Sequence, residues 1–288
     1  MTTGGDALNV AVTLKKLGVD ATLSCYIGND VNGDFILERL TELGIDTQGV
    51  LRHSNIGTAV CYILIEDDGQ RHFLSYSDIH EVISDRDVSD EQIEKADIVF
   101  YGSAMAHKNM DTGGAAALFK RARRLGKMTV ADATLNDDSK GGNYWRNQLG
   151  SMLNETDFFL PSYEEAVLLT GELELSNIRE AFSRYGLKNL VVKLGERGCY
   201  LTDFKTESFV PAINVPDVVD TTGAGDSFVG GLLRGVLVGW PIETSALFAN
   251  AVASFNVKMI GATAGVPDFD TAYKFVTQNY GGEKKFPI

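Results

Sequence analysis

Residues 219–233 carry the residue types that a phosphoryl-transfer site requires. Gly223 and Gly225 flank a single alanine, Ala224, so backbone amides there can approach a ligand without a Cβ in the way. The apolar run that follows predicts a helix, and the first amides of a helix have no partners within it and carry partial positive charge. Such a helix start can bind an anion such as a phosphoryl group.

Asp226 would lie at the mouth of this anion site. A carboxylate would repel a phosphate that merely bound there, but it can take a proton from an attacking hydroxyl while the amides stabilise the transferring group. The stretch therefore predicts phosphoryl transfer to an alcohol, with Asp226 as base and Gly223, Ala224 and Gly225 as the anion hole. The alternative is a tight strand-to-helix turn, since Asp is common near helix starts.

Two strings of the sequence resemble one known family. DTTGAGDSF at residues 220–228 resembles the signature of the ribokinase-like (PfkB) carbohydrate kinases, and GGDALNVA at residues 4–11 looks like that family's GGxxxN element. The resemblance covers nearly the whole chain. It implies an ATP-dependent sugar kinase with a three-layer α/β fold, in which a mostly parallel central sheet has helices on both faces and a small β-sheet forms a lid.

Composition limits the class of protein. The chain has 288 residues, of which 44% are hydrophobic and 23% charged, as in ordinary globular proteins, and we expect one α/β domain over residues 1–288. The net charge of −13 argues against nucleic acid or an anionic membrane as a partner. The sparse cysteines Cys25, Cys61 and Cys199 favour a reducing compartment. No run of 18 apolar residues and no secretion signal is present, so we expect a cytoplasmic protein.

Helical and strand patterns alternate along the chain, which predicts a parallel sheet with helices on its faces. Helices are expected at 6–17, 33–43, 111–125, 241–258 and 268–280, besides the one that begins after Gly225. Strands are expected at 21–27, 96–101, 128–131, 189–193, 199–202 and 208–211.

One segment departs from this alternation. Residues 58–65 and 71–76 are strand-like, and the Asp-Gly between them is a hairpin signal. Because two strands alone are marginal in water, we expect them to form a small sheet with residues 50–53. The resemblance implies that this sheet, within about residues 50–77, is a lid over the sugar and pairs two subunits into a homodimer. The alternative is a surface hairpin without a role.

The resemblance implies that Gly4, Gly5 and Asn9 line the sugar pocket together with Asp226, and Asp6 is a further candidate. Family members have a strand before the GG element, with an Asp for the sugar hydroxyls. This sequence shows only Met1-Thr2-Thr3 there, so no such Asp can be named. Further along, the family often has D-x-N-x-R, and this chain keeps Asp132 but has Thr134 in place of the Asn.

The acceptor therefore stays open among fructose, ribose, 2-keto-3-deoxygluconate and glycated amino acids. A nucleoside kinase, a sugar-phosphate kinase and a catalytically silent sugar-binding protein are the alternatives. A dinucleotide-dependent oxidoreductase would need G-x-G-x-x-G after the first strand, and the chain has no such string. The four histidines, among them His72 and His107, show no catalytic spacing, and we expect structural or exposed roles for them.

Further residues are assigned to ATP and Mg²⁺ by the resemblance. Ser162-x-x-Glu165 matches the family's N-x-x-E with Ser for Asn, and Glu165 would hold the water shell of Mg²⁺. The same spacing also fits a helix capping box. The remaining cofactor-binding residues implied by the family are Lys193, Gly195 and Gly198 along the phosphates and ribose, and Asn250 near the adenine.

Local alternatives apply to these residues too. Residues 195–198 could form a plain hairpin turn, and Asn250 could be an exposed helical Asn. The resemblance also implies a monovalent cation, K⁺, held largely by carbonyl oxygens. The residues of that site would be Asp220, Thr222, Asn256, Met259, Gly261 and Gly265.

Overall fold

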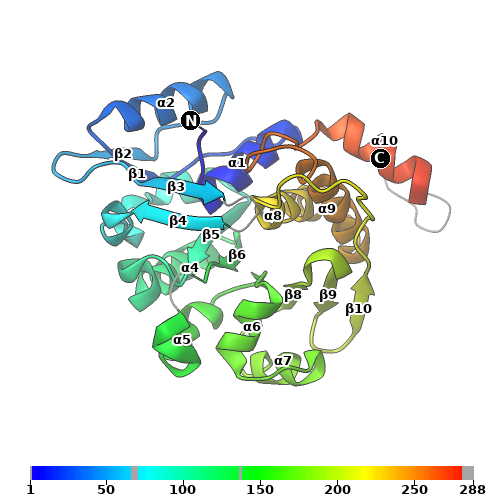
Figure 1. The fold of residues 1–288 in the computed structure, drawn as a ribbon. Coiled ribbons are helices and arrows are strands. Elements are labelled where there is room, and N and C mark those ends of the chain that lie inside the picture. Colours follow the sequence, from blue (N-terminus) through cyan, green and yellow to red (C-terminus); the bar gives the residue numbers. More distant parts are fainter. Residues whose placement is uncertain (1, 66–70, 136–137, 281–288) are drawn as a thin grey trace.

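A computed structural model of the chain describes residues 2–65, 71–135 and 138–280. Its centre is a six-stranded sheet in the order β10-β9-β8-β7-β6-β5 (Figure 1). Strands β5 to β8 run parallel to one another, and β9 runs antiparallel to both of its neighbours, β8 and β10. The bounds are β5 Ile98–Ala104, β6 Met128–Ala133, β7 Phe158–Phe159, β8 Asn189–Lys193, β9 Cys199–Thr202 and β10 Glu207–Val210.

Helices cover both faces of this sheet, which confirms the expected three layers (Figure 1). The apolar run of β8 shows why, since Leu190 and Val192 pack into one buried cluster and Val191 into the other. One face carries α3 Asp90–Lys95, α4 Ala115–Arg124, α5 Gly141–Leu153, α6 Tyr163–Thr170 and α7 Leu175–Phe182. The other carries α1 Asp6–Lys16, α8 Ala224–Leu237, α9 Ile242–Asn256 and α10 Phe269–Tyr280.

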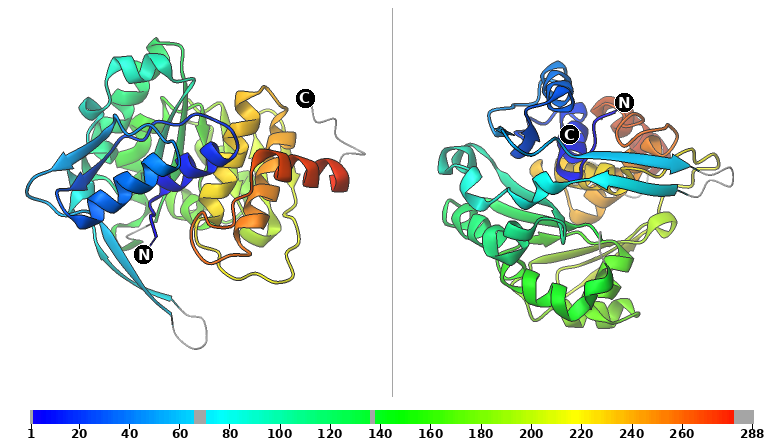
Figure 2. Two further views of the ribbon diagram at one scale, coloured as in Figure 1. Left: turned by 90° about the horizontal axis from the view of Figure 1, so that it is seen from above. Right: turned by 60° about the vertical axis from the view of Figure 1, so that its left-hand side comes forward.

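Among the described residues, two smaller two-stranded sheets lie outside the central sheet. Strands β1 (Cys25–Gly28) and β2 (Val50–His53) are parallel and joined through α2 (Val31–Glu42), while β3 (Val60–Ile65) and β4 (Arg71–Tyr76) form an antiparallel hairpin. The hairpin projects from the body of the molecule (Figure 2). Its predicted Asp-Gly turn lies outside the described residues.

The expected pairing of residues 50–53 with this hairpin is wrong. Val50 to His53 pair with Cys25 to Gly28 instead. The reason is the helix between them, because a strand-helix-strand unit returns its second strand parallel to the first. The expectation relied on short sequence distance to the hairpin, and the crossover through α2 overrides it.

The predicted helix at 111–125 is also partly wrong. Its first turn, Met110–Gly114, is a wide turn in which Thr112 and Gly113 are not helical, and regular helix begins with α4. The cause is Asp111, which is buried and whose carboxylate accepts hydrogen bonds from the amides of Met105 and His107 and from the Tyr101 hydroxyl. This carboxylate ties the turn to the chain before it.

Short helical turns occur at Asp78–Glu81, Asp85–Asp87, Asp138–Lys140 and Gly195–Arg197. In the part of the chain that the structure covers, no helix has the length and apolarity needed to traverse a bilayer.

Helix α8 is set in place by close contacts at glycines. A Cβ on Gly230 would lie 2.5 Å from Cγ2 of Thr13 on α1, and a Cβ on Gly231 would lie 2.8 Å from Cα of Ala249 on α9. Larger residues at either position would therefore push α8 away from its neighbours. These contacts fix the position of the helix that begins next to the predicted anion hole.

Candidate active site

The start of α8 has the geometry of an anion site. Gly223 is the N-cap with φ 72°, in the left-handed region, and a Cβ there would come within 2.1 Å of the Ala262 carbonyl oxygen, so this position requires glycine. The Ala224 amide, predicted to face the anion, donates to the Thr221 carbonyl at 3.1 Å. Among the described residues, the amides of Gly223, Gly225 and Asp226 have no such acceptor.

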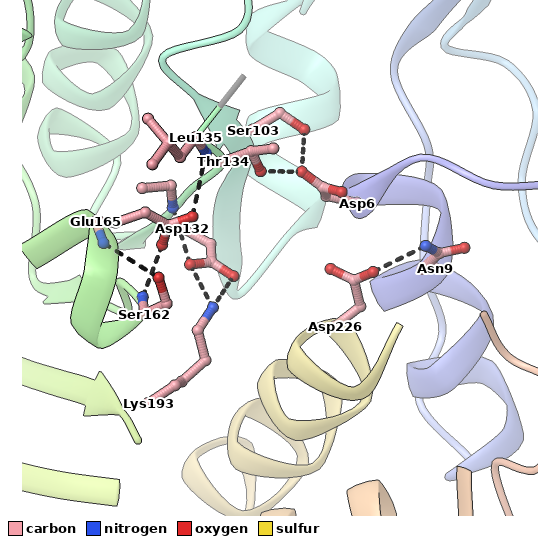
Figure 3. Close-up of polar contacts among 11 residues, drawn as sticks. Asp6, Asn9, Ser103, Asp132, Thr134, Leu135, Ser162, Glu165, Lys193 and Asp226 are labelled. Carbon is pink, nitrogen blue, oxygen red and sulfur yellow. Dashed lines mark hydrogen bonds and ion pairs between the residues drawn. The ribbon is translucent and has the colours of Figure 1, made fainter. Parts of the chain in front are cut away.

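Asp226 lies in the first turn of α8 and faces α1 (Figure 3). Its carboxylate accepts a hydrogen bond from Asn9 Nδ2 at 2.8 Å. Burial raises the pKa of Asp226 to about 7, with the charge of Asp6 acting in the same direction and Asn9 and Lys193 opposing it. A base with a pKa near neutrality suits proton removal from a hydroxyl.

Asp6, on the first turn of α1, lies on the same side of the site. It accepts hydrogen bonds on Oδ2 from the hydroxyls of Ser103, at 2.5 Å, and Thr134. Ser103 and Thr134 come from the carboxyl ends of the neighbouring strands β5 and β6 (Figure 3). Thr134 was noted in the sequence only as a departure from the family pattern, and Ser103 was missed because nothing near it marks a site.

A buried ion pair forms the other side of the site. Lys193 Nζ lies 2.5 and 2.7 Å from the two carboxylate oxygens of Asp132, at the ends of β8 and β6 (Figure 3). Burial alone would lower the pKa of Lys193, but the carboxylates of Asp132 and Glu165 outweigh it and raise the pKa. A Cβ on Gly225 would lie 3.7 Å from Nζ, so this ammonium adjoins the start of α8. The helix start and a cation thus converge on one point.

Ser162 and Glu165 form the capping box that the sequence left as an alternative. Ser162 Oγ accepts from the Glu165 amide at 3.2 Å, and Glu165 Oε2 accepts from the Ser162 amide at 2.7 Å. Glu165 Oε1 also accepts from the Leu135 amide at 3.2 Å. The cap is therefore confirmed, and a role toward Mg²⁺ stays a prediction about the same carboxylate.

These groups open onto a cavity of about 550 Å³. It brings together the predicted residues Ser162, Glu165, Lys193, Gly195 and Gly225. The other lining residues are Tyr163, Glu164, Leu194, Glu196 and Arg197, which the sequence did not single out.

Gly198 and Asn250 are not among the lining residues of this cavity. A Cβ on Gly198 would lie 2.1 Å from the Val210 carbonyl oxygen, so this glycine allows a close backbone contact with β10. Asn250 is buried, and its amide donates to the carbonyls of Val210 and Pro211. The alternative of an exposed Asn250 is therefore wrong, and both residues contact the end of β10.

The residues assigned to the monovalent cation lie together. The Asp220 carboxylate accepts from the Thr222 amide at 2.9 Å and from the Gly261 amide at 2.9 Å. Asn256 Nδ2 donates to the carbonyls of Thr222 and Ala262, while Asn256 Oδ1 is buried without a hydrogen bond from a described residue. The Met259 amide donates to the Asn256 carbonyl, and a Cβ on Gly265 would lie 2.7 Å from that same oxygen.

A base with a near-neutral pKa, free helix amides and a buried lysine meet at the carboxyl ends of parallel strands. Phosphoryl transfer depends on positioning and on stabilising negative charge, and this arrangement provides both. The fold and the site therefore define the class as a phosphotransferase with an alcohol acceptor.

Comparison with known proteins defines the family. The model of the pfkB family carbohydrate kinase matches residues 1–268, and the chain belongs to this family of carbohydrate kinases. A probable fructokinase-5 of Arabidopsis thaliana is 28% identical over 95% of this chain and 87% of its own. An ATP-dependent ribose-1-phosphate kinase of Halopiger xanaduensis is 29% identical over 96% of this chain and 87% of its own.

A solved structure supports the same assignment. The ribokinase of Arabidopsis thaliana complexed with ribose and ATP superposes with a TM-score of 0.82, at 25% identity over 99% of this chain and 88% of its own. The expected ribokinase-like fold is thereby confirmed.

The raised pKa of Asp226 predicts a pH-dependent cost to stability. Well below pH 3.8 the carboxyl is protonated in both the folded and the unfolded state, and its burial costs little. Between the ordinary pKa of 3.8 and the folded-state pKa of about 7, the carboxyl is ionised only in the unfolded state. The free energy of unfolding of the wild type therefore falls as the pH rises through this range. At pH 8 the full cost is present, and we expect Asp226→Asn to raise the free energy of unfolding by about 1–4 kcal/mol.

Urea unfolding of both proteins at pH 8 and at pH 4.5 measures this difference. The gain should be several-fold smaller at pH 4.5, because this pH lies less than about one unit above the ordinary pKa of the carboxyl in the unfolded state. An equal gain at both pH values, or a loss at pH 8, would contradict the raised pKa.

Proposed function

We propose that this carbohydrate kinase transfers the γ-phosphoryl group of ATP to a primary hydroxyl of a monosaccharide. The observation that carries the proposal is the buried Asp226, whose pKa of about 7 makes it a suitable base at the start of α8. ATP as donor is supported by the ribokinase complex and by the name of the relative from Halopiger xanaduensis.

The reaction follows from what each group offers. Asp226 takes the proton of the acceptor hydroxyl while the oxygen of that hydroxyl attacks the γ-phosphorus, and ADP leaves from the opposite side of the phosphorus. The free amides of Gly223 and Gly225 and the ammonium of Lys193 stabilise the negative charge on the phosphoryl group in transfer. Asn9 holds Asp226 in orientation through its hydrogen bond. Gly4 and Gly5, at the start of α1, let the acceptor approach the backbone beside Asn9.

The cavity beside Lys193 is the site we assign to the nucleotide. Ser162 and Gly195 line it, and we place the phosphates along this wall. Gly198 and Asn250 contact the end of β10 instead. Mg²⁺ would neutralise phosphate charge, and Glu165, which lines the cavity, is the residue we assign to its water shell.

We also propose K⁺ as a second cation. The carbonyl-rich site around Asp220 and Asn256 adjoins Gly223, and Asn256 Oδ1 is a buried oxygen that fits such an ion. Faster turnover in K⁺ than in Na⁺ salts at equal ionic strength is expected, and equal rates would exclude this role.

Loss of the base tests the proposal as a whole. Wild-type protein is screened for ADP release with fructose, ribose and 2-keto-3-deoxygluconate, and kcat/KM should rise as the pH passes about 7. Asp226→Asn should lower kcat by about 10²–10⁴-fold while the sugar still binds, measured by calorimetry. Asp20→Asn, at an exposed aspartate, is the control with wild-type rates.

Unchanged turnover in Asp226→Asn would refute the proposal. Binding of a sugar with no ADP release in the wild type would favour the silent sugar-binding protein instead.

Glu165 and Ser162 allow the metal role and the capping role to be separated. Glu165→Gln keeps an N3 acceptor for the Ser162 amide but removes the charge, so we expect the Mg²⁺ concentration for half-maximal rate to rise about 10-fold with little change in melting temperature. Ser162→Ala should cost about 1 kcal/mol of stability and leave the Mg²⁺ dependence unchanged. An unaltered Mg²⁺ dependence in Glu165→Gln would contradict the metal role and leave Glu165 with the capping role alone.

We further propose that the hairpin pairs two copies of the chain. Its cross-strand partners Tyr62 and Leu74 are 63% and 65% exposed, and Tyr76 shares their face. An apolar face this exposed on a projecting hairpin is typical of an interface.

Sedimentation velocity tests this pairing. We expect a dimer for the wild type and a monomer for Leu74→Lys, because a charge at the centre of the face would be buried unpaired. Val31→Lys, at an exposed valine of α2, is the control that should stay dimeric. A monomeric wild type would contradict the proposed pairing through the hairpin.

A further inference from the structure

Asp6 presents one carboxylate oxygen to the acceptor side of the site. Both hydrogen bonds that it accepts, from Ser103 and Thr134, end on Oδ2. Within residues 2–65, 71–135 and 138–280, no donor is bonded to Oδ1. The side chain is half-buried, and Figure 3 shows its second oxygen on the side of Asp226. An oxygen in this position can accept a hydrogen bond from a bound molecule.

Helix α1 places Asp6 within electrostatic reach of Asp226. Asp6 and Asn9 are three residues apart on α1 and so share one face, and Asn9 donates to Asp226. After burial, the charge of Asp6 is the largest cause that raises the pKa of Asp226. The two carboxylates therefore face one shared space (Figure 3).

The backbone that holds Asp6 is constrained. Ser103 has φ 64° and Met105 has φ 82°, both unusual for residues other than glycine, and the pairing of β5 with β6 shifts between Tyr101 and Ala104. The Thr134 amide also donates to the Ala104 carbonyl, so the two strand ends are joined. This bulge turns the Ser103 hydroxyl to Asp6, and the two hydroxyls fix the direction of the remaining oxygen.

Among the described residues, the two carboxylates that face this space have no directly paired cation, since neither Asp6 nor Asp226 forms an ion pair with a lysine or arginine. His80 and His107, whose rings lie 5.0 Å apart, are within the electrostatic reach of Asp6. Burial lowers the pKa of both, that of His107 to about 4, so they are neutral at pH 7. Lys193, whose charge lowers the pKa of Asp226, is itself paired with Asp132.

From this arrangement we propose that Asp6 determines acceptor specificity, accepting a hydrogen bond on Oδ1 from a second hydroxyl of an uncharged polyhydroxylated acceptor. A phosphate in the same space would meet two carboxylates without a paired cation, and this juxtaposition of like charges disfavours its binding. The proposal rests on the proposed function and narrows its acceptor to unphosphorylated sugars.

Asp6→Asn tests the contact, with kcat and KM measured on the best neutral sugar of the screen. The substitution keeps the size and removes the charge, so we expect KM for the sugar to rise about 10- to 100-fold and KM for ATP to stay unchanged. Asp20→Asn is the matched control with wild-type values. Melting temperatures of both variants show that they are folded, and if Asp6→Asn does not fold, Asp6→Glu, whose longer arm misplaces the oxygen, takes its place.

Deoxy analogues of the same sugar identify the partner hydroxyl. One analogue should raise KM about 10-fold or more in the wild type and much less in Asp6→Asn, because the bond that it removes is already absent there. Equal penalties in both proteins would overturn the contact. They would leave the kinase activity itself intact, so the failure is distinct from that of the proposed function.

Acceptor charge is tested with fructose against fructose 6-phosphate and ribose against ribose 1-phosphate. The wild type should favour each neutral sugar by at least about 100-fold in kcat/KM, and Asp6→Asn should narrow that preference. A wild-type preference for either phosphorylated acceptor would overturn the proposal. ADP release from none of the four would count against the proposed function.

Discussion

The site depends on a carboxyl group that is buried next to the amino end of its own helix. Water would stabilise the charge of Asp226, and burial removes that water, so its pKa rises to about 7. The free amides at the start of α8 stabilise negative charge at the same place. With a pKa near 7, the Asp226 carboxyl can take up or release a proton at neutral pH. It can do so while an anion is bound at the amino end of α8.

That arrangement requires three helices to meet with little space between them. Asn9 of α1 donates to Asp226 across 217 residues of sequence, and glycines on α8 allow α1 and α9 to approach its backbone. Gly223 packs against the Ala262 carbonyl and so joins the helix start to the turn at 261–265. The packing of one layer of the fold therefore sets both the position of the base and the shape of the anion site.

The sequence predicted the parts of the site that are local. The glycines and Asp226 lie within one turn, and their types alone indicate a helix start with a carboxylate beside it. The Asp132–Lys193 pair could not be predicted as a contact, because its members end two strands 61 residues apart and only the sheet order brings them together. The burial of Asn250 and the return of β2 to β1 were missed for the same reason, since both depend on which elements are neighbours in space. Ser103 gave no signal because its role follows from a backbone bulge.

The cost of the buried carboxyl group also bears on how the fold is stabilised. An ionised Asp226 opposes folding above pH 7, and Asp6 adds to that cost. Large apolar residues of α8 and α9, such as Phe228, Leu232 and Phe248, are buried in the layer directly behind it. Burial of such side chains contributes about 1.5–3 kcal/mol each, which is enough to offset one unfavourable charge. The dense packing of α1, α8 and α9 therefore positions the base and also offsets the free-energy cost of burying its charge.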